Sequence, residues 1–437
     1  MYFQGYNQDA VLRQASPENL RRTAEKSPMT ETNLASTIQV TALATLLEQA
    51  HTPHKLDVYR GVLTPQMLDA PEREIAALVE GAAVHDLGWQ RRVAVRGEDR
   101  FRWLSGMVTN TVNDLFPNTG AWNLVLNAQG RIVGDLTVWR EGEELSPQRR
   151  NPAGAGAKAG DNPEDRLRGT PFAGESGLVL EIAADQCAKL LAHLNGFIIM
   201  DDVELIPLGE EPVGEPGSET ALGLTGPLAN DVLERLGLPV FAHPMMGTSV
   251  EWNGFDVRIL RGYGVHSPHY QLRVQSAGLG KLWSCLRTAG AKPVGCASLE
   301  ALRIAEAIPV YGIDMAERDL PQETSQMRAL HFNKGCYLGQ EIVERIRSRG
   351  NVHRHLRPLE LFGPLPEAGT ELTLEDGKAA GQITSAAELP LANGNRVFAL
   401  GMVRGEAELG NHVLSYAAGT DKGTAQILVS PPMLNAS

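Results

Sequence analysis

The fold of this protein is best indicated by residues 334–341, which read KGCYLGQE. Glycines stand on both sides of Cys336, and Lys334 precedes it by two residues. If a helix begins near Cys336, exposed N–H groups and the helix dipole would favour a thiolate there. The ammonium group of Lys334 would lower the pKa of the thiol further and make it reactive. The alternative is a small, buried cysteine in a tight turn, and these residues alone leave both interpretations open.

This segment leads into the one basic run of an acidic chain, which contains Arg345, Arg347 and Arg349. Because side chains alternate along a β-strand, the three arginines would share one face of a strand. Such a face could bind a polyglutamate tail, a phosphate or an acidic partner surface. A solvated face that pairs with local carboxylates is the alternative. His353 and His355 also share a face by their spacing, but two histidines make a weak metal site, and we predict no resident metal.

Further upstream, two strand-like runs at residues 122–126 and 132–139 are joined by the turn sequence NAQG, which predicts a β-hairpin. Asp135 lies in the second run. Gly130 and Gly134 carry no side chains and would let a flat ligand approach the backbone. The carboxylate of Asp135 could then accept hydrogen bonds from a pterin-like ring with amine and amide donors. An edge-strand aspartate that faces water is the alternative.

The composition excludes several classes of partner. The chain has 437 residues and a formal net charge of −12, so it is a poor general binder of nucleic acid or of anionic membranes. No apolar run approaches the roughly 20 residues that span a bilayer. The four cysteines form no CxxC pair, which indicates reduced thiols and a cytoplasmic location.

Changes in residue composition and hydrophobic pattern divide the chain into three parts. Residues 1–50 contain a tag scar, MYFQG, and a poorly ordered leader that ends in a helix. Residues 51–355 mix strand pairs with helices and form an α+β core, with a Gly- and Pro-rich insertion at 141–177 that should be mobile. Residues 356–437 hold short strands between turn residues, which predicts an antiparallel barrel. Within the core, a helix over 298–307 is expected, with Ser298 as its N-cap.

Residues 334–341 match the signature KGCYxGQE of the YgfZ family. The members of this family are folate-binding proteins of iron–sulfur cluster assembly and repair, related to the glycine-cleavage T-protein (aminomethyltransferase). Other segments resemble the family too, namely residues 95–101 with 109–110, 127–131 with Asp135, 302–309 with 311–314, and 320–323. The resemblance begins at about residue 82 and continues to the C-terminus, and the insertion at 141–177 departs from it.

The resemblance implies an α+β fold in which two interleaved domains surround a central hole that accepts tetrahydrofolate, followed by a C-terminal antiparallel β-barrel. It implies that Cys336 and Asp135 are the reactive groups, since Asp135 occupies the position of the T-protein carboxylate near the reactive end of folate. The residues expected to bind folate are Asn127, Arg131, Asp135, Arg303 and Tyr311. The signature residues are Lys334, Gly335, Cys336, Tyr337, Gly339, Gln340 and Glu341, and the expected anion or partner face is Arg345, Arg347 and Arg349.

The chain departs from the T-protein pattern at two charged positions. The T-protein run GYTGExGVE is replaced by GYGVHSPHYQ at residues 262–271, which puts Gln271 at the second acidic position. Leu299 replaces the arginine that opens the T-protein run RDxLR, although Arg303 remains. A pocket without those charges could hold a pterin ring, but it is a poor site for releasing ammonia from an aminomethyl-lipoyl arm.

Three functional hypotheses follow. The first is a tetrahydrofolate-binding accessory factor for iron–sulfur cluster assembly or repair, a monomer whose partners are folate and iron–sulfur client or assembly proteins. The second is an enzyme, a folate-dependent aminomethyltransferase or another one-carbon transferase. The third is a scaffold that docks a client through its arginine face and for which folate is vestigial, so that it no longer binds tetrahydrofolate. The residues alone leave open whether the protein is an enzyme.

Overall fold

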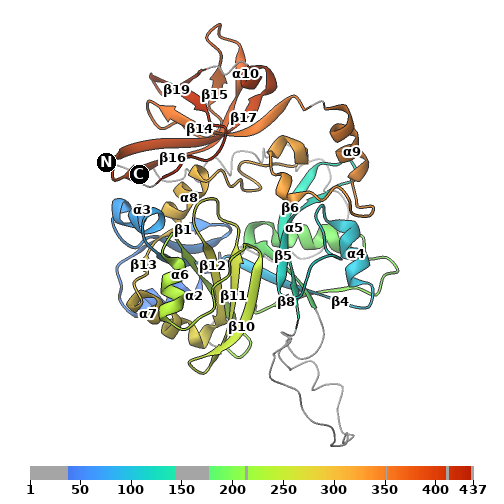
Figure 1. Ribbon diagram of the computed structural model, residues 1–437, viewed down its shortest axis with the longest axis vertical. Helices are drawn as coiled ribbons and strands as arrows, with labels where there is room; N and C mark the ends of the chain where they lie inside the picture. The colour runs from blue at the N-terminus through green and yellow to red at the C-terminus, as the bar shows by residue number, and fades with distance from the viewer. Residues whose placement is uncertain (1–37, 143–176, 212–214, 351, 410–412, 435–437) are drawn as a thin grey trace, which may run out of the picture. The chain divides into compact units, whose positions relative to one another are not determined.

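The computed structural model describes residues 38–142, 177–211, 215–350, 352–409 and 413–434 (Figure 1). The expected leader and most of the insertion that was expected to be mobile lie outside these residues. All the helices and strands named below belong to the unit formed by residues 39–437.

The first helix, α2 (Ala42–Gln49), forms where the leucine spacing predicts one. Thr41 is its N-cap, and its hydroxyl accepts a hydrogen bond from the backbone N–H of Ala44 at 3.3 Å. Leu43 and Leu47 lie one turn apart and are buried in the same core cluster. The hairpin of β1 (Lys55–Tyr59) and β2 (Val62–Met67) follows, and then α3 (Pro71–Val79).

The core contains a sheet of eleven strands that consists of two halves. The first half runs in the order β13 (Lys292–Pro293), β3 (Ala83–Asp86), β9 (Glu219–Thr225), β12 (His269–Gln275), β11 (Phe255–Gly262) and β10 (Met246–Trp252). The second half runs in the order β5 (Thr119–Leu126), β6 (Ile132–Glu141), β7 (Gly177–Ala183), β4 (Gln90–Arg96) and β8 (Glu204–Leu208). The halves join where Met246 pairs with Thr119.

The chain passes between the two halves more than once. It leaves the first half after β3, builds the second half with β4 to β8, and returns to the first half at β9. The expected arrangement of two interleaved α+β domains is therefore confirmed.

Separate sets of helices cover the two halves (Figure 1). Helices α6 (Ala229–Arg235) and α7 (Leu279–Thr288) share a hydrophobic core with the first half. Helices α4 (Arg100–Met107) and α5 (Ala184–Asn195) share another with the second half. Alternate residues of β7, namely Leu178, Leu180 and Ile182, are buried in that second core, as a strand with one face against helices requires.

The hairpin predicted around Asn127 is confirmed as β5 and β6. In its turn the backbone N–H of Gly130 donates to the carbonyl oxygen of Asn127 at 2.9 Å, and Gly130 has a φ of 69°. That backbone conformation is readily available to glycine and costly for a residue with a Cβ atom.

The predicted C-terminal barrel is also confirmed. It is closed, and its strands follow the order β14 (Arg354–Phe362), β17 (Gly394–Arg404), β16 (Ala379–Leu391), β15 (Glu371–Thr373), β18 (Leu414–Ala418) and β19 (Asp421–Ile427). Helix α10 (Gly405–Leu409) follows β17. Side chains of β16 and β17, including Leu389 and Phe398, pack with α3 and α8 (Cys296–Ala305) in a third core cluster, so the barrel rests on the α+β core.

The predicted role of Ser298 as an N-cap is wrong. Helix α8 begins at Cys296 after Gly295, so Ser298 lies inside its first turn. The Ser298 hydroxyl instead donates to the buried carboxylate of Glu74 at 2.6 Å. The same carboxylate accepts a hydrogen bond from the backbone N–H of Gly295 at 3.2 Å, so a side chain of α3 holds the start of α8.

The predicted strand of arginines is wrong as well. Residues 340–349 form helix α9 (Gln340–Arg349), so Arg345, Arg347 and Arg349 do not share one face. Arg345 pairs with Glu341 four residues earlier at 2.5 Å, and Arg347 pairs with Glu344 three residues earlier at 3.5 Å. Ile342, Val343 and Ile346 have the spacing of one helix face, and Val343 is fully buried. The strand prediction followed the alternating arginines and did not use this helical pattern.

The helix also begins later than expected. Gly339, with a φ of 81°, precedes its first residue, Gln340, so Cys336 lies four residues before the helix and not at its N-terminus. The backbone N–H groups of the first turn are therefore not presented to the Cys336 thiol.

Candidate functional site

A cavity of about 470 Å³ opens between the two half-sheets. Its wall contains side chains of β5, β6 and β7 from the second half, of β3, β9 and β12 from the first half, and of α8. This volume is within the usual range of small-molecule sites. The central opening that the resemblance implies is thus a cavity of ligand size.

Asp135 of β6 lies in this wall, and its carboxylate is held at both oxygens. The indole N–H of Trp122 donates to Oδ2 at 2.9 Å, and the amide of Gln186 donates to Oδ1 at 3.0 Å. The backbone N–H of Asp135 donates back to the side-chain oxygen of Gln186 at 3.1 Å. Among the described residues no cation pairs with this carboxylate, so its remaining lone pairs are available to a ligand with N–H donors.

The cavity wall is rich in aromatic side chains, namely Tyr59, Trp89, Trp122, Trp139, Tyr263 and Tyr270. The guanidinium group of Arg328 lies over two of these rings, 3.5 Å from the centre of the Tyr263 ring and 4.9 Å from that of Trp122. Burial lowers the pKa of Arg328 to about 10. Flat aromatic faces beside fixed polar groups suit a planar ligand.

Glu181 of β7 connects the two halves across the cavity. Its carboxylate accepts hydrogen bonds from Gln90 at 3.0 Å, from Gln271 at 2.8 Å and from Arg273 at 2.6 Å. Gln271, which was expected at the second acidic position of the T-protein pattern, therefore donates to a neighbouring carboxylate and supplies no negative charge.

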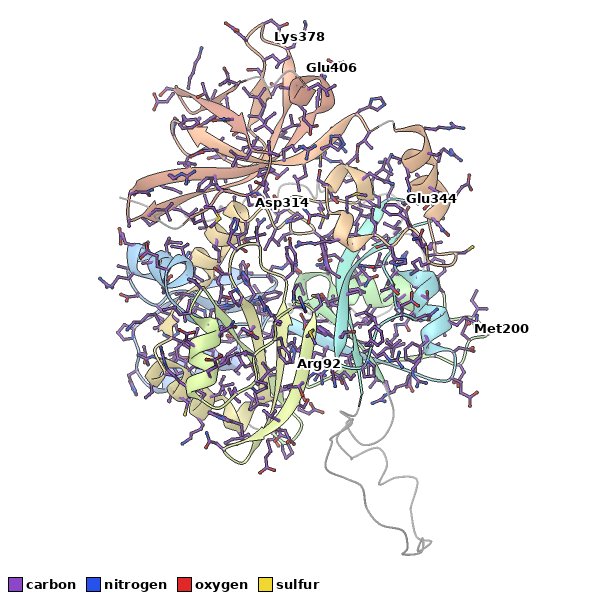
Figure 2. All side chains as sticks on the ribbon, in the orientation of Figure 1. Arg92, Met200, Asp314, Glu344, Lys378 and Glu406 are labelled. Atoms are coloured by element: carbon purple, nitrogen blue, oxygen red, sulfur yellow. The ribbon has the colours of Figure 1, made fainter. Side chains whose placement is uncertain are left out.

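A second buried ionic group ties the same two halves together. Arg92 of β4 pairs with Glu141 of β6 at 2.9 Å and with Glu219 of β9 at 2.5 Å (Figure 2). Arg258 of β11 approaches Glu141 at 3.2 Å. These contacts hold the half-sheets at a fixed separation and so support the shape of the cavity.

Four further polar side chains of the wall form a hydrogen-bonded chain that the sequence analysis missed. His85 Nε2 lies 3.0 Å from the hydroxyl of Thr225, which lies 3.3 Å from Nδ1 of His269, and His269 Nε2 lies 3.1 Å from Glu306. Burial lowers the pKa of His85 to about 3, and the charge of His269 acts in the same direction. Burial opposes ionisation of Glu306, but His269 and His266 together outweigh it, so the pKa of that carboxyl is lowered.

One sequence signal could have indicated this chain. Gly223 lies opposite His85 in the sheet, and a Cβ atom there would lie only 1.9 Å from the His85 ring. A glycine in the interior of a strand often marks such a close approach.

Arg303 also lies in the wall, but its charge is already neutralised. Its guanidinium donates to Glu300 at 2.8 Å and to Asp314 at 2.5 Å. Asp314 additionally accepts hydrogen bonds from the hydroxyls of Thr384 and Ser385 in β16 at 2.7 and 2.6 Å. The arginine thus anchors the barrel to the core through Asp314, which Figure 2 labels below the barrel strands.

The other residues expected to bind folate are not part of the cavity wall. Asn127 caps the hairpin turn, since its side-chain oxygen accepts from the backbone N–H groups of Gln129 and Arg131, both at 3.0 Å. The Arg131 guanidinium donates to the carbonyl oxygen of Arg318 at 2.5 Å. The hydroxyl of Tyr311 accepts from Lys189 at 2.8 Å. The structure therefore does not bring these three residues together with Asp135.

The signature segment lies outside the cavity wall and holds the hairpin in place. Tyr337 is buried with Leu124 and Ile132 in a core cluster of its own. A Cβ atom at Gly339 would lie 2.7 Å from the carbonyl oxygen of Asn127, and one at Gly130 would lie 2.7 Å from Ile342. The two glycines thus let the start of α9 pack directly on the hairpin turn.

Cys336 is exposed, whereas Cys187 and Cys296 are buried. The ammonium group of Lys334 donates to the carbonyl oxygens of Val108 and Asn110 at 2.8 and 2.6 Å, and burial lowers its pKa to about 8. Lys334 is thus bound to the backbone of a neighbouring loop. Its second acceptor, Asn110, lines the cavity, so one residue separates the signature from the ligand site.

No group of three or more histidine, cysteine, aspartate or glutamate side chains among the described residues could hold a metal ion. No helix of the described residues is long and apolar enough to cross a membrane.

Comparisons with known proteins agree with the fold. Residues 45–146 match the family described as the GCVT N-terminal domain. A protein of Arabidopsis thaliana, named as a candidate chloroplastic transferase, is 23% identical over 80% of this chain and 71% of its own length. An aminomethyltransferase of Geobacillus kaustophilus is 24% identical over 77% of this chain and 83% of its own length.

A solved structure shows the same architecture. The crystal structure of the glycine cleavage system aminomethyltransferase T from Bartonella henselae matches with a TM-score of 0.73 and 17% identity, and covers 91% of this chain and 99% of its own. The chain therefore has the fold of the T-protein-like superfamily, as the sequence resemblance implies.

Proposed function

We propose that this T-protein-like chain binds tetrahydrofolate in its central cavity and serves as an accessory factor in the assembly or repair of iron–sulfur proteins. The observation that carries the folate part is the carboxylate of Asp135, held by Trp122 and Gln186 in a cavity of about 470 Å³. A pterin ring offers amine and amide donors to such a fixed acceptor and a flat face to the surrounding rings.

The residues named as folate-binding would then act in two ways. Asp135 would contact the pterin ring directly, and Arg303 would shape the wall while it anchors the barrel. Asn127, Arg131 and Tyr311 would act by holding the hairpin and its neighbours in place.

The iron–sulfur part of the proposal rests on the signature segment. Cys336 is an exposed thiol, and a Cβ atom on the adjacent Gly335 would have no heavy atom within 4 Å, so a partner protein could reach this loop. Lys334 connects the loop to Asn110 in the cavity wall at 2.6 Å. Folate occupancy and the presentation of Cys336 could therefore influence each other. The proposal includes a monomer in the cytoplasm whose partners are iron–sulfur client or assembly proteins.

The folate part is tested by titrating the protein with tetrahydrofolate in a calorimeter, with Asp135→Asn beside the wild type. We expect the wild type to bind and the variant to lose about tenfold in affinity or more, since a hydrogen bond to a charged group contributes about 1.5–3 kcal/mol. Absence of binding by the wild type would overturn this part of the proposal.

The iron–sulfur part is tested in a knockout strain with low activity of cluster-dependent enzymes. The wild-type gene should restore that activity, and Cys336→Ala should not, whereas Cys285→Ala serves as a matched control for loss of another thiol. Equal rescue by wild type and Cys336→Ala would remove Cys336 from the role.

An aminomethyltransferase is the second candidate, favoured by the names of the relatives. It would use the same cavity, with Asp135 at the reactive end of folate. Leu299 and Gln271 at the two charged positions of the T-protein argue against it. Turnover with a lipoyl-bearing protein, lost in Asp135→Asn, would establish this function.

A further inference from the structure

Arg328 is a partly buried cation in the cavity wall that has no anionic partner. Among the described residues, no ion pair and no hydrogen bond involves its guanidinium group, whose contacts are the rings of Tyr263 and Trp122. Its Nε atom is fully buried and has no hydrogen-bond partner. Every other arginine of the wall has a carboxylate near it: Arg303 pairs with Asp314 at 2.5 Å, and Arg60 lies 3.6 Å from Asp185.

An unpaired guanidinium that is partly buried is costly, because it loses part of its hydration without gaining an opposite charge. The effect is visible in the pKa of Arg328, which burial lowers to about 10 even though Glu306 and Asp135 act in the opposite direction. The two aromatic rings recover part of the cost through cation–π contacts. They also restrict the guanidinium group, whose fork of N–H donors suits a planar, two-pronged acceptor such as a carboxylate.

Arg328 lies at the mouth of the cavity. Tyr263 lines the cavity and is 42% exposed, and Met327, next to Arg328 in the chain, is 51% exposed. Asp135 and Arg328 both contact Trp122. Asp135 accepts a hydrogen bond from the indole N–H, and Arg328 lies over the ring. A ligand whose donor-rich ring reaches Asp135 could therefore place an acidic group against Arg328 near solvent.

We propose that Arg328 binds a carboxylate of the ligand in this cavity, and that on folate this is a carboxylate of the glutamate tail. The inference rests on the proposed function for the identity of the ligand. It also replaces the anion face expected from Arg345, Arg347 and Arg349, of which the first two pair with glutamates of their own helix. Leu299, which stands where the T-protein has an arginine, lines the same cavity, so Arg328 would supply the positive charge that this position lacks.

The experiment compares two probes, tetrahydrofolate and tetrahydropteroate, which lacks the glutamate. Both are titrated in a calorimeter into the wild type and into Arg328→Gln at constant ionic strength. The wild type should bind tetrahydrofolate about ten- to hundredfold more tightly than tetrahydropteroate, and Arg328→Gln should bind both about equally. Arg328→Lys should keep part of the preference, because it retains the charge but not the two-pronged geometry.

Arg287→Gln is the matched control, because Arg287 also lies over an aromatic ring, Trp283 at 5.8 Å, but outside the cavity wall. It should keep the full preference for tetrahydrofolate. Equal binding of the two probes by the wild type, or an undiminished preference in Arg328→Gln, would overturn the role of Arg328 while folate binding stands. If neither probe binds the wild type, the proposed function itself fails, and the glutamate assignment fails with it.

Discussion

At the scale of single residues, the cavity combines groups whose charge is compensated with groups whose charge is not. Glu181 and Arg303 are surrounded by partners and hold the structure together. Asp135 and Arg328 lack an oppositely charged partner among the described residues and are the groups a ligand would complete. Under the proposed function, this contrast, more than the type of residue, separates structural from binding side chains in this wall.

His85 shows how strongly the wall is dehydrated, and it gives a prediction for acid stability. Its pKa is lowered to about 3 in the folded protein, so between pH 6.5 and 3 the unfolded chain binds a proton that the folded one does not. The contribution of neutral His85 to the free energy of unfolding is therefore fully present above about pH 6.5. It is lost as the pH falls, by up to about 1.4 kcal/mol per pH unit. Urea unfolding between pH 7.5 and 5 should show a shallower loss of stability for His85→Asn than for the wild type.

The control for this prediction is His243→Asn, since His243 is exposed. It should leave the acid limb of the stability curve as it is in the wild type. Parallel curves for wild type and His85→Asn would show that burial of His85 has no effect on stability in this pH range.

At the scale of elements, the signature segment is a structural connection between α9 and the β5–β6 hairpin. Gly130 and Gly339 face each other closely enough that a Cβ atom on either would collide with the other element. Tyr337 adds a buried side chain to the same junction. Packing therefore explains much of the segment. The exposed part around Cys336 is the part on which the proposed function depends.

Gly339→Ala tests this junction, and the other end of α9 supplies a matched control. Gly339 and Gly350 have φ values of 81° and 70°, so alanine is strained at both, by about 1–2 kcal/mol. At Gly339 a Cβ atom would also lie 2.7 Å from the Asn127 carbonyl, whereas at Gly350 it would meet nothing within 4 Å. Urea unfolding should therefore show a larger loss of stability for Gly339→Ala than for Gly350→Ala. Equal losses would mean that the contact with the hairpin contributes nothing.

At the scale of the whole molecule, buried polar groups join parts that the chain order separates. Arg92 and Glu181 connect the two half-sheets, and Asp314 connects the core to the barrel. Asp314 is 2% exposed and accepts hydrogen bonds from Arg303 on one side and from Thr384 and Ser385 on the other. The barrel should therefore unfold together with the core.

Asp314→Ala tests that coupling. Removal of one partner of a buried ion pair typically costs about 3–5 kcal/mol, because the other charge stays buried. We expect a lower urea midpoint and early proteolytic cleavage between core and barrel. Ser385→Ala removes one hydroxyl donor and should cost only about 1 kcal/mol, with no separate cleavage. A single transition with the wild-type midpoint in Asp314→Ala would contradict this role.

The sequence alone determined the features that depend on neighbours along the chain. The hairpin around Asn127 and the strands of the barrel follow from alternating side chains and turn residues, and the structure confirms them. The interleaved arrangement was predicted from the family resemblance, because a run of matched residues is inherited together with a fold. Alternation along the chain gave a wrong prediction where a strand pattern and a helix pattern overlapped. Arg345 and Arg347 alternate as in a strand, but Ile342 and Ile346 have helical spacing, and the segment is a helix.

The family resemblance named Asp135 and Arg303, which both lie in the cavity wall, but most other members of that wall were decided only by the tertiary structure. The hydrogen-bonded chain of His85, Thr225, His269 and Glu306 joins parts of the sequence that lie far apart. These residues meet because β3, β9, β12 and the end of α8 are adjacent in space. Asn127 and Arg131 lie near Asp135 in sequence but point to other partners. Which charges are neutralised, and which remain for a ligand, depends on distances through space, and those are set only when the two half-sheets and the barrel pack together.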